Sequence, residues 1–151
     1  TMIDLCEVIK AYYYNPHTKG SNSIKAIWPS IFKTSVFIKE KYSQPIADIN
    51  MTSKNFPSDY KWLRIKDGEI EDPYKSLDKP FKDWDTDFER KSDIEEINNG
   101  GAALTAYGLT QYTDMSTEER NTLSEALLKY CELDTLAMVM VFEHLREIME
   151  L

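Results

Sequence analysis

The sequence predicts a mainly α-helical protein with one small β-hairpin, and three features carry this prediction. Apolar residues recur at helical spacing over residues 117–149, which is the longest periodic stretch of the chain. A capping-box pattern, Ser116 followed three positions later by Glu119, marks the start of that helix. An Asp67-Gly68 pair between two short runs of strand-forming residues suits a tight hairpin turn, where φ is positive.

The composition is that of one globular unit, so we treat residues 1–151 as a single domain. With 18 basic and 26 acidic residues, the formal charge is -8, which argues against nonspecific nucleic-acid binding by this chain alone. The longest apolar stretch, residues 133–142, is far shorter than the ~20 residues of a membrane span. Since the first residues do not read as a secretory leader, we expect a cytoplasmic protein without membrane contact.

The first predicted helix covers residues 2–14 and stops before Pro16. Cys6 occupies an apolar position of this helix, as Cys131 does in the last one. Two such widely separated cysteines favour reduced thiols in the core over a disulfide.

A short helix is predicted over residues 24–28, where Pro29 limits it. Ser21 or Ser23 can cap its start by accepting backbone N–H groups. Another helix is expected over residues 35–42.

Residues 39–92 read as a loop-rich insertion that is poor in aliphatic residues and broken by four prolines, Pro45, Pro57, Pro73 and Pro80. Within it, residues 60–71 form the predicted hairpin around the Asp67-Gly68 turn.

The acidic run over residues 83–96 does not read as a calcium loop. An EF-hand loop needs glycine at its sixth position and glutamate at its twelfth, whereas the run has Phe88 and Ile94 there. We interpret it as a solvated acidic face. A turn over residues 98–101 then leads to a close-packed helix over residues 102–112.

Asp134 is the most informative residue of the last helix. Residues three or four positions apart share a helix face, so the apolar stripe reads Leu123, Leu127, Tyr130, Asp134, Met138, Val141, Leu145 and Ile148. An unpaired buried carboxylate is costly, so Asp134 needs a cation, a hydrogen-bonding partner or a water-filled cleft. The alternative is that Asp134 marks the edge of the stripe or caps a neighbouring loop.

Tyr130 lies one helical turn before Asp134, so a phenol and a carboxylate can meet the same water, metal ion or phosphate. The two histidines, His17 and His144, have no nearby pattern that indicates a nucleophilic triad, and His144 is expected at a polar position of the last helix.

Residues 130–134, Tyr-Cys-Glu-Leu-Asp, resemble the third motif of the DEDD exonucleases of the ribonuclease H-like superfamily, in its tyrosine variant. Three patches also resemble a bacterial domain-of-unknown-function family, numbered 2779, whose members look like nucleases. These patches are residues 4–14, residues 20–25 (Gly-Ser-Asn-Ser-Ile-Lys), and residues 130–139 together with residues 99–102.

This resemblance implies the C-terminal portion of a ribonuclease H-like α/β nuclease domain with metal-dependent 3′–5′ exonuclease chemistry on DNA or RNA. It makes Asp134 a ligand of a catalytic Mg²⁺ or Mn²⁺ ion and Tyr130 the residue that orients the attacking water. The other acidic motifs of the family are missing, and Asp4 resembles a residue downstream of the second of them, so we do not count it as a metal ligand. We therefore expect an excised C-terminal segment that has little activity alone and meets its nucleic acid together with an upstream segment.

Two other functions remain open. In a non-catalytic protein-interaction module, the acidic middle and exposed aromatic residues such as Trp62 and Trp84 would contact a protein partner. A degenerate nuclease fold that only binds nucleic acid would need a basic groove, for which Lys61, Arg64 and Lys66 are the modest candidates.

Overall fold

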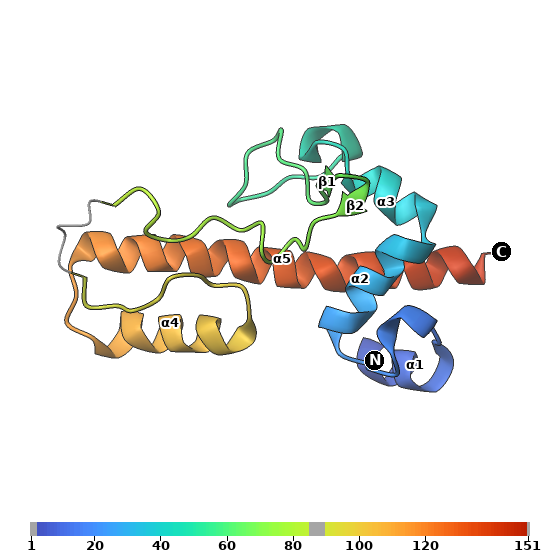
Figure 1. The fold of residues 1–151 in the computed structure, drawn as a ribbon, viewed down its shortest axis with the longest axis horizontal. Helices are drawn as coiled ribbons and strands as arrows, with labels where there is room; N and C mark the ends of the chain where they lie inside the picture. Colours follow the sequence, from blue (N-terminus) through green and yellow to red (C-terminus); the bar gives the residue numbers. More distant parts are fainter. Residues whose placement is uncertain (1–2, 85–89, 151) are drawn as a thin grey trace.

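One long helix, α5 (Thr117–Met149), runs the length of the molecule, and the other elements pack along it (Figure 1). The structure is a computed structural model that describes residues 3–84 and 90–150. The remaining helices are α1 (Leu5–Tyr12), α2 (Ile24–Thr34), α3 (Val36–Tyr42) and α4 (Gly100–Tyr112), with short 3₁₀ turns η1 (Pro16–Thr18) and η2 (Ile46–Ile49). The prediction of a mainly helical protein is confirmed.

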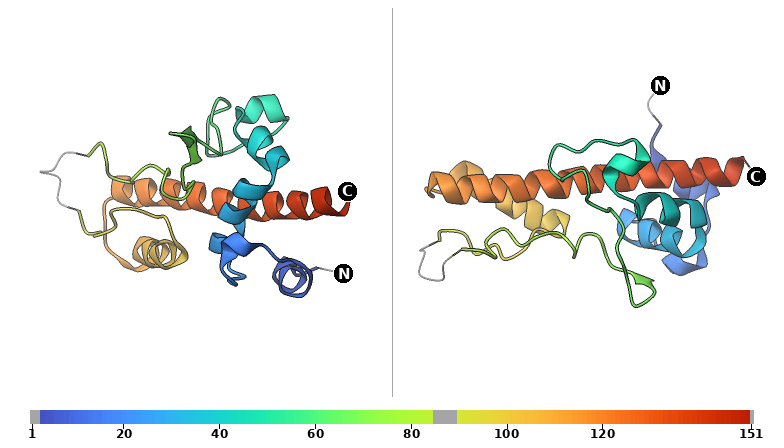
Figure 2. Two further views of the ribbon diagram at one scale, coloured as in Figure 1. Left: turned by 45° about the vertical axis from the view of Figure 1, so that its right-hand side comes forward. Right: turned by 90° about the horizontal axis from the view of Figure 1, so that it is seen from above.

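The other helices pack beside different halves of α5. α4 lies antiparallel beside its first half, whereas α1, α2 and α3 gather near its second half (Figure 1). Seen from above, α2, α3 and the loop that follows the hairpin lie on one side of α5 (Figure 2). This arrangement places the start of α2 and the start of α4 near the middle of α5.

Helix α2 is longer than predicted because it continues through Pro29 to Thr34. Proline cannot donate the backbone hydrogen bond to the residue four positions earlier, which is Lys25. Both residues are exposed, so water can satisfy the carbonyl of Lys25. Buried side chains on both sides of Pro29, including Trp28 and Ile31, hold the helix on the core.

The predicted hairpin is confirmed, although it is shorter than residues 60–71. Strands β1 (Ile65–Lys66) and β2 (Glu69–Ile70) are antiparallel, and Ile65 pairs with Ile70. Asp67 and Gly68 both have positive φ, 52° and 83°, as the turn chemistry requires.

A long loop follows the hairpin and runs along α5 toward the start of that helix (Figure 1). Residues 90–99 then run back along α5 to the start of α4. Glu119 holds the backbone of residues 90–99 in place through two hydrogen bonds near the start of that segment. Ser116 caps α5 by accepting the N–H of Glu119, as predicted. The Glu119 carboxylate does not complete the capping box, because it is buried and accepts the N–H groups of Lys91 and Ser92 at 3.0 and 2.8 Å.

The buried stripe of α5 differs from the predicted one in the second half of the helix. The buried or partly buried positions alternate by three and four residues, through Leu123, Ala126, Tyr130, Leu133, Ala137, Met140 and His144. Two residues of the predicted stripe, Met138 and Ile148, are 40% and 43% exposed. His144, which was expected at a polar position, is buried instead and contacts the Tyr13 hydroxyl at 3.2 Å and Glu147 at 3.1 Å.

Two smaller expectations are also wrong. Gly100 and Gly101 are the first residues of α4 rather than part of a turn, because the Asn99 side chain caps the helix there. Cys6 and Cys131 are free, as expected, but both are exposed rather than in the core.

The acidic run agrees in part with a solvated face. Asp83, Asp93, Glu95 and Glu96 are exposed. Asp85, Asp87 and Glu89 lie outside the described residues.

Within residues 3–84 and 90–150, no helix combines the length and the apolar character that crossing a membrane requires.

Candidate functional site

The candidate site is built around Asp134, which is partly buried at the edge of the α5 stripe, one position after the buried Leu133. This is the alternative that the sequence left open. The hydroxyl of Tyr74, on the loop after the hairpin, donates a hydrogen bond to Asp134 Oδ1 at 2.6 Å. From the described residues, Asp134 Oδ2 receives no hydrogen bond. One carboxylate oxygen is therefore held by the protein and the other is available.

Tyr130 lies beside this pair. Its ring packs against the Tyr74 ring with the centroids 5.7 Å apart, and only 7% of its surface is exposed. Its hydroxyl faces the start of α4, since a Cβ atom on Gly100 would lie 3.9 Å from it. Tyr130 and Asp134 thus share one region, as their spacing predicted, but Tyr74 covers both.

Tyr74 also forms one wall of a pocket of about 230 Å³ between the starts of α2 and α4. The pocket is lined by Lys25 and Pro29 from α2, by Asp72, Tyr74 and Lys75 from the loop, and by Asn98 and Asn99 before α4. Figure 1 shows the starts of α2 and α4 facing each other beneath the middle of α5. The buried Tyr74 therefore contacts both the pocket and the carboxylate, although Asp134 is not part of the pocket lining.

Both phenols stay protonated at neutral pH. Burial raises the pKa of Tyr74 beyond the usual range, and the hydrogen bond to Asp134 and its negative charge raise it further. Burial also raises the pKa of Tyr130, with a contribution from the charge of Asp134. Each hydroxyl can therefore donate a proton to a hydrogen bond, and neither serves as a phenolate base at neutral pH.

These raised pKa values predict that the protein loses stability in alkaline solution. An unfolded tyrosine releases its proton near pH 10, while the folded chain still holds the proton of Tyr74, so the native state binds more protons. The free energy of unfolding should then fall as pH rises above about 10, by up to about 1.4 kcal/mol per pH unit for this phenol. Urea titrations between pH 8 and 11 measure the slope.

The Tyr74→Phe variant is the comparison for this slope. It should lose about 1–3 kcal/mol at pH 7, because the carboxylate loses a hydrogen bond, and show a shallower decline above pH 10. An unchanged slope would mean that Tyr74 does not hold its proton as the contact with Asp134 indicates.

The patches that resemble the nuclease family do not all meet here. Lys25, from residues 20–25, and Asn99, from residues 99–102, line the same pocket. Residues 4–14 lie elsewhere: Asp4 caps α1 by accepting the N–H of Cys6 at 2.8 Å, and Tyr13 meets His144 ten residues beyond Asp134.

Sequence reasoning missed Tyr74, Lys75 and Asn98. Tyr74 lies in a polar loop next to Pro73, where no periodic pattern marks it. Its distinctive property is its burial in the structure, at 5% exposure. An aromatic residue isolated in such a loop is a signal of a tertiary contact, but it does not say with what.

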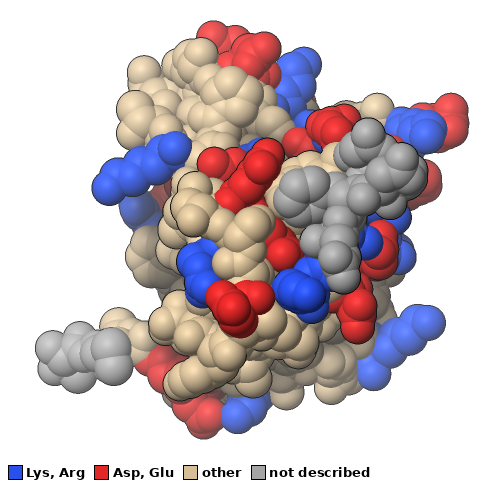
Figure 3. Space-filling view, turned by 90° about the vertical axis from the view of Figure 1, so that its left-hand side faces the viewer, with Lys and Arg blue, Asp and Glu red and all other residues tan. Residues whose placement is uncertain are grey.

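The residues proposed for the other two functions are placed differently from the prediction. Trp62 is buried, so it is not an exposed contact residue, and Trp84 packs partly buried against the core. Lys61, Arg64 and Lys66 are exposed, but Arg64 stacks on the Tyr60 ring at 5.0 Å. On the end of the molecule where α5 begins, basic and acidic side chains are interspersed rather than segregated (Figure 3).

In the described part of the chain, no group of three or more histidine, cysteine, aspartate or glutamate residues is placed to hold a metal ion. Asp134 is thus a single carboxylate, of the hard oxygen type that Mg²⁺ and Mn²⁺ bind.

Comparison of the chain with protein-family models, with curated proteins and with solved structures found no match.

Proposed function

We propose that Tyr130 and Asp134 belong to the active site of a metal-dependent phosphodiesterase, a 3′–5′ exonuclease that acts on DNA or RNA in the cytoplasm. The observation that supports this function best is the convergence at Tyr74. Its hydroxyl contacts Asp134, and its ring borders the pocket that Lys25 and Asn99 line. Lys25 and Asn99, which come from two of the patches that resemble one nuclease family, are thus linked through Tyr74 to one candidate catalytic carboxylate.

Asp134 fits a metal site as one ligand, because its Oδ2 receives no hydrogen bond from the described residues. It does not make a complete site alone. The proposal therefore assigns the further carboxylates to another segment of the same protein, which together with the nucleic acid is the proposed partner. When bound, Mg²⁺ or Mn²⁺ would supply an activated water and would stabilise the leaving oxygen.

The residues of this chain position the reacting groups. Tyr74 holds Oδ1 and so orients the other carboxylate oxygen. Tyr130 keeps its proton, since burial and the charge of Asp134 raise its pKa, and its hydroxyl can position a water molecule by hydrogen bonding.

The test is digestion of single-stranded DNA and RNA by the natural protein that contains this chain, in the presence of Mn²⁺. We expect substrate labelled at its 5′ end to give a ladder of progressively shorter products, and EDTA to stop the reaction. The 151-residue chain, assayed alongside, should show little or no digestion. A folded natural protein that digests neither substrate would contradict the proposal.

The second candidate function is a non-catalytic protein-interaction module. Two observations favour it, and the first is that the hydroxyl of Tyr74 already satisfies one oxygen of Asp134. The outer side of α4 also exposes the apolar side chains of Leu104 and Tyr107, at 73% and 56%. This function would be favoured if the natural protein showed no Mn²⁺-dependent digestion of DNA or RNA and if substitution of Asp134 left its other properties unchanged.

A further inference from the structure

The pocket between α2 and α4 carries positive charge in a protein that is negative overall. Lys25 and Lys75 line it, and the structure records no ion pair for either lysine within the described residues. Asp72 is the one acidic residue of its lining. The formal charge of the lining is therefore +1, against -8 for the chain.

The lining is held in place by local contacts. The ammonium group of Lys25 lies 5.7 Å from the centre of the Tyr74 ring. Asp72 is engaged in its own turn, where its side chain accepts the N–H of Tyr74 at 3.0 Å and its carbonyl accepts the N–H of Lys75 at 3.0 Å. Asn99 is fixed as well, because it caps α4 and donates to Asn98. One carboxylate oxygen of Asp72 is thus engaged in the turn, and neither ammonium group forms an ion pair with it.

The size of the pocket suits a small anion. Its volume of about 230 Å³ equals that of roughly eight water molecules at ~30 Å³ each, which is ample for a tetrahedral group of five heavy atoms. Phosphate oxygens accept hydrogen bonds from donors such as lysine ammonium groups and the side-chain amides of Asn98 and Asn99.

We propose that this pocket binds a phosphate group of a nucleic-acid strand, with Lys25 and Lys75 as its charged contacts. This inference deepens the proposed function and rests on it. Tyr74 lines the pocket and Asp134 does not, so we assign the bound phosphate to a nucleotide beside the scissile bond rather than to that bond itself. The positive charge of the two lysines would attract the phosphate group locally, although the chain as a whole is negatively charged.

The test is a titration of the ¹⁵N-labelled 151-residue chain, in EDTA and at constant ionic strength, followed by amide chemical shifts. The ligands are inorganic phosphate, a thymidine dinucleotide with one phosphodiester, and thymidine. We expect shifts of the amides near the pocket with both phosphate compounds, tighter binding of the dinucleotide, and no binding of thymidine. Binding of inorganic phosphate alone would overturn the assignment to a nucleic-acid strand.

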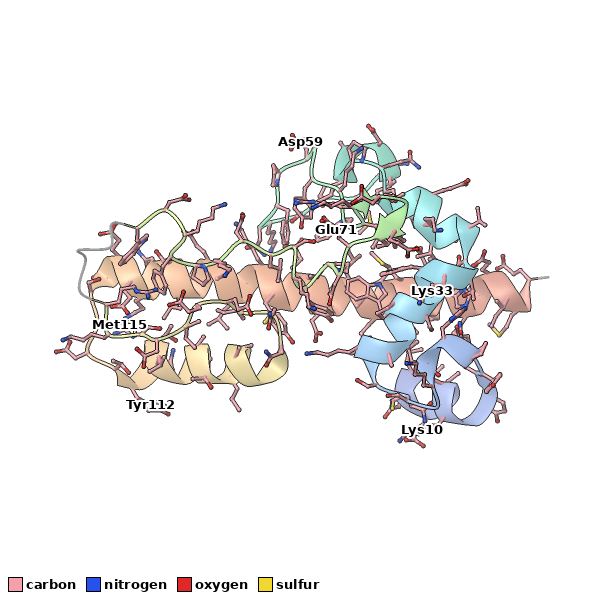
Figure 4. The ribbon with its side chains drawn as sticks, in the orientation of Figure 1. Lys10, Lys33, Asp59, Glu71, Tyr112 and Met115 are labelled. Carbon is pink, nitrogen blue, oxygen red and sulfur yellow. The ribbon has the colours of Figure 1, made fainter. Side chains whose placement is uncertain are left out.

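Substitutions separate the pocket from general surface charge. Lys25→Gln should weaken dinucleotide binding about tenfold, because a charge-assisted hydrogen bond is lost, whereas Lys25→Arg should retain most of it. Lys33→Gln is the matched control: it removes the same charge from an exposed position of the same helix, outside the pocket lining (Figure 4). Equal weakening by Lys25→Gln and Lys33→Gln in well-folded proteins would overturn the pocket.

The two proposals fail separately because the titration contains no metal and requires no turnover. Metal-dependent digestion by a protein whose dinucleotide affinity does not depend on Lys25 would overturn the pocket and leave the nuclease. Lys25-dependent binding of the dinucleotide in a protein without nuclease activity would support the phosphate pocket and contradict the nuclease.

Discussion

Asp134→Asn should lower the rate of the proposed exonuclease reaction by about a thousandfold, which corresponds to about 4 kcal/mol of lost transition-state stabilisation. The reason is the charge of the side chain. Asparagine keeps the shape of aspartate and its Oδ1 can still accept the hydroxyl of Tyr74, but it is a neutral and much weaker metal ligand. The measurement is the initial rate of digestion with Mn²⁺ at saturating substrate.

Three controls make the loss interpretable. Glu125→Gln removes one charge by the same isosteric change from an exposed position of α5, and it should leave the rate unchanged. Unfolding of Asp134→Asn in urea should differ from the wild type by no more than about 1 kcal/mol, because a hydrogen bond to a charged acceptor becomes one to a neutral acceptor. Mn²⁺ binding followed by electron paramagnetic resonance should weaken in Asp134→Asn and not in Glu125→Gln.

A fully active Asp134→Asn protein would contradict catalysis at this site. The contact between Tyr74 and Asp134 would then be a structural hydrogen bond, and the catalytic carboxylates of the protein would lie elsewhere.

Local sequence signals were sufficient for the elements whose ends depend on nearby residues. Ser116 accepts the N–H of Glu119, and Asp67 and Gly68 take the left-handed backbone of the hairpin turn. Pro29 was misleading because its penalty is also local, about 3 kcal/mol or more for an interior position, whereas the burial that outweighs it comes from a helix more than a hundred residues away.

The register of α5 could not be read from the helix alone. Apolar residues occur in adjacent registers, so that Asp134 and Met138 form one helical stripe and Leu133 and Ala137 form another. The partners decide between them, since α4 packs on the first half of α5 and α2 on the second (Figure 1). Asp134 therefore lies beside the buried stripe and not within it.

The candidate site shows the same limit. The four-residue spacing correctly placed Tyr130 and Asp134 in one region, because both lie on one helix. Tyr74 and Lys75 come from a loop without periodicity, and they reach α5 and the pocket only through tertiary packing. His144 was misplaced for a related reason, since its contact with Tyr13 spans 131 positions.

Trp28→Ala should destabilise the chain by about 3–5 kcal/mol, the cost of removing a fully buried aromatic side chain and leaving a cavity. Trp28 is 0% exposed and joins three elements. Its indole N–H donates to the sulfur of Met140 on α5, and its ring meets Tyr74 edge-on with the centroids 5.2 Å apart. Urea unfolding at pH 7 measures the change.

Two further variants, Trp28→Phe and Tyr112→Ala, serve as comparisons for this loss of stability. Trp28→Phe keeps an aromatic ring against Tyr74 but loses the N–H donor and part of the volume, so its loss should be smaller than that of Trp28→Ala. Tyr112, on the outer side of α4, is 91% exposed, and its truncation should change the free energy of unfolding by less than about 0.5 kcal/mol (Figure 4). Similar small losses for Trp28→Ala and Tyr112→Ala would mean that α2 is not anchored on α5 through Trp28. In that case the same packing could not hold Tyr74 in contact with both the pocket and Asp134.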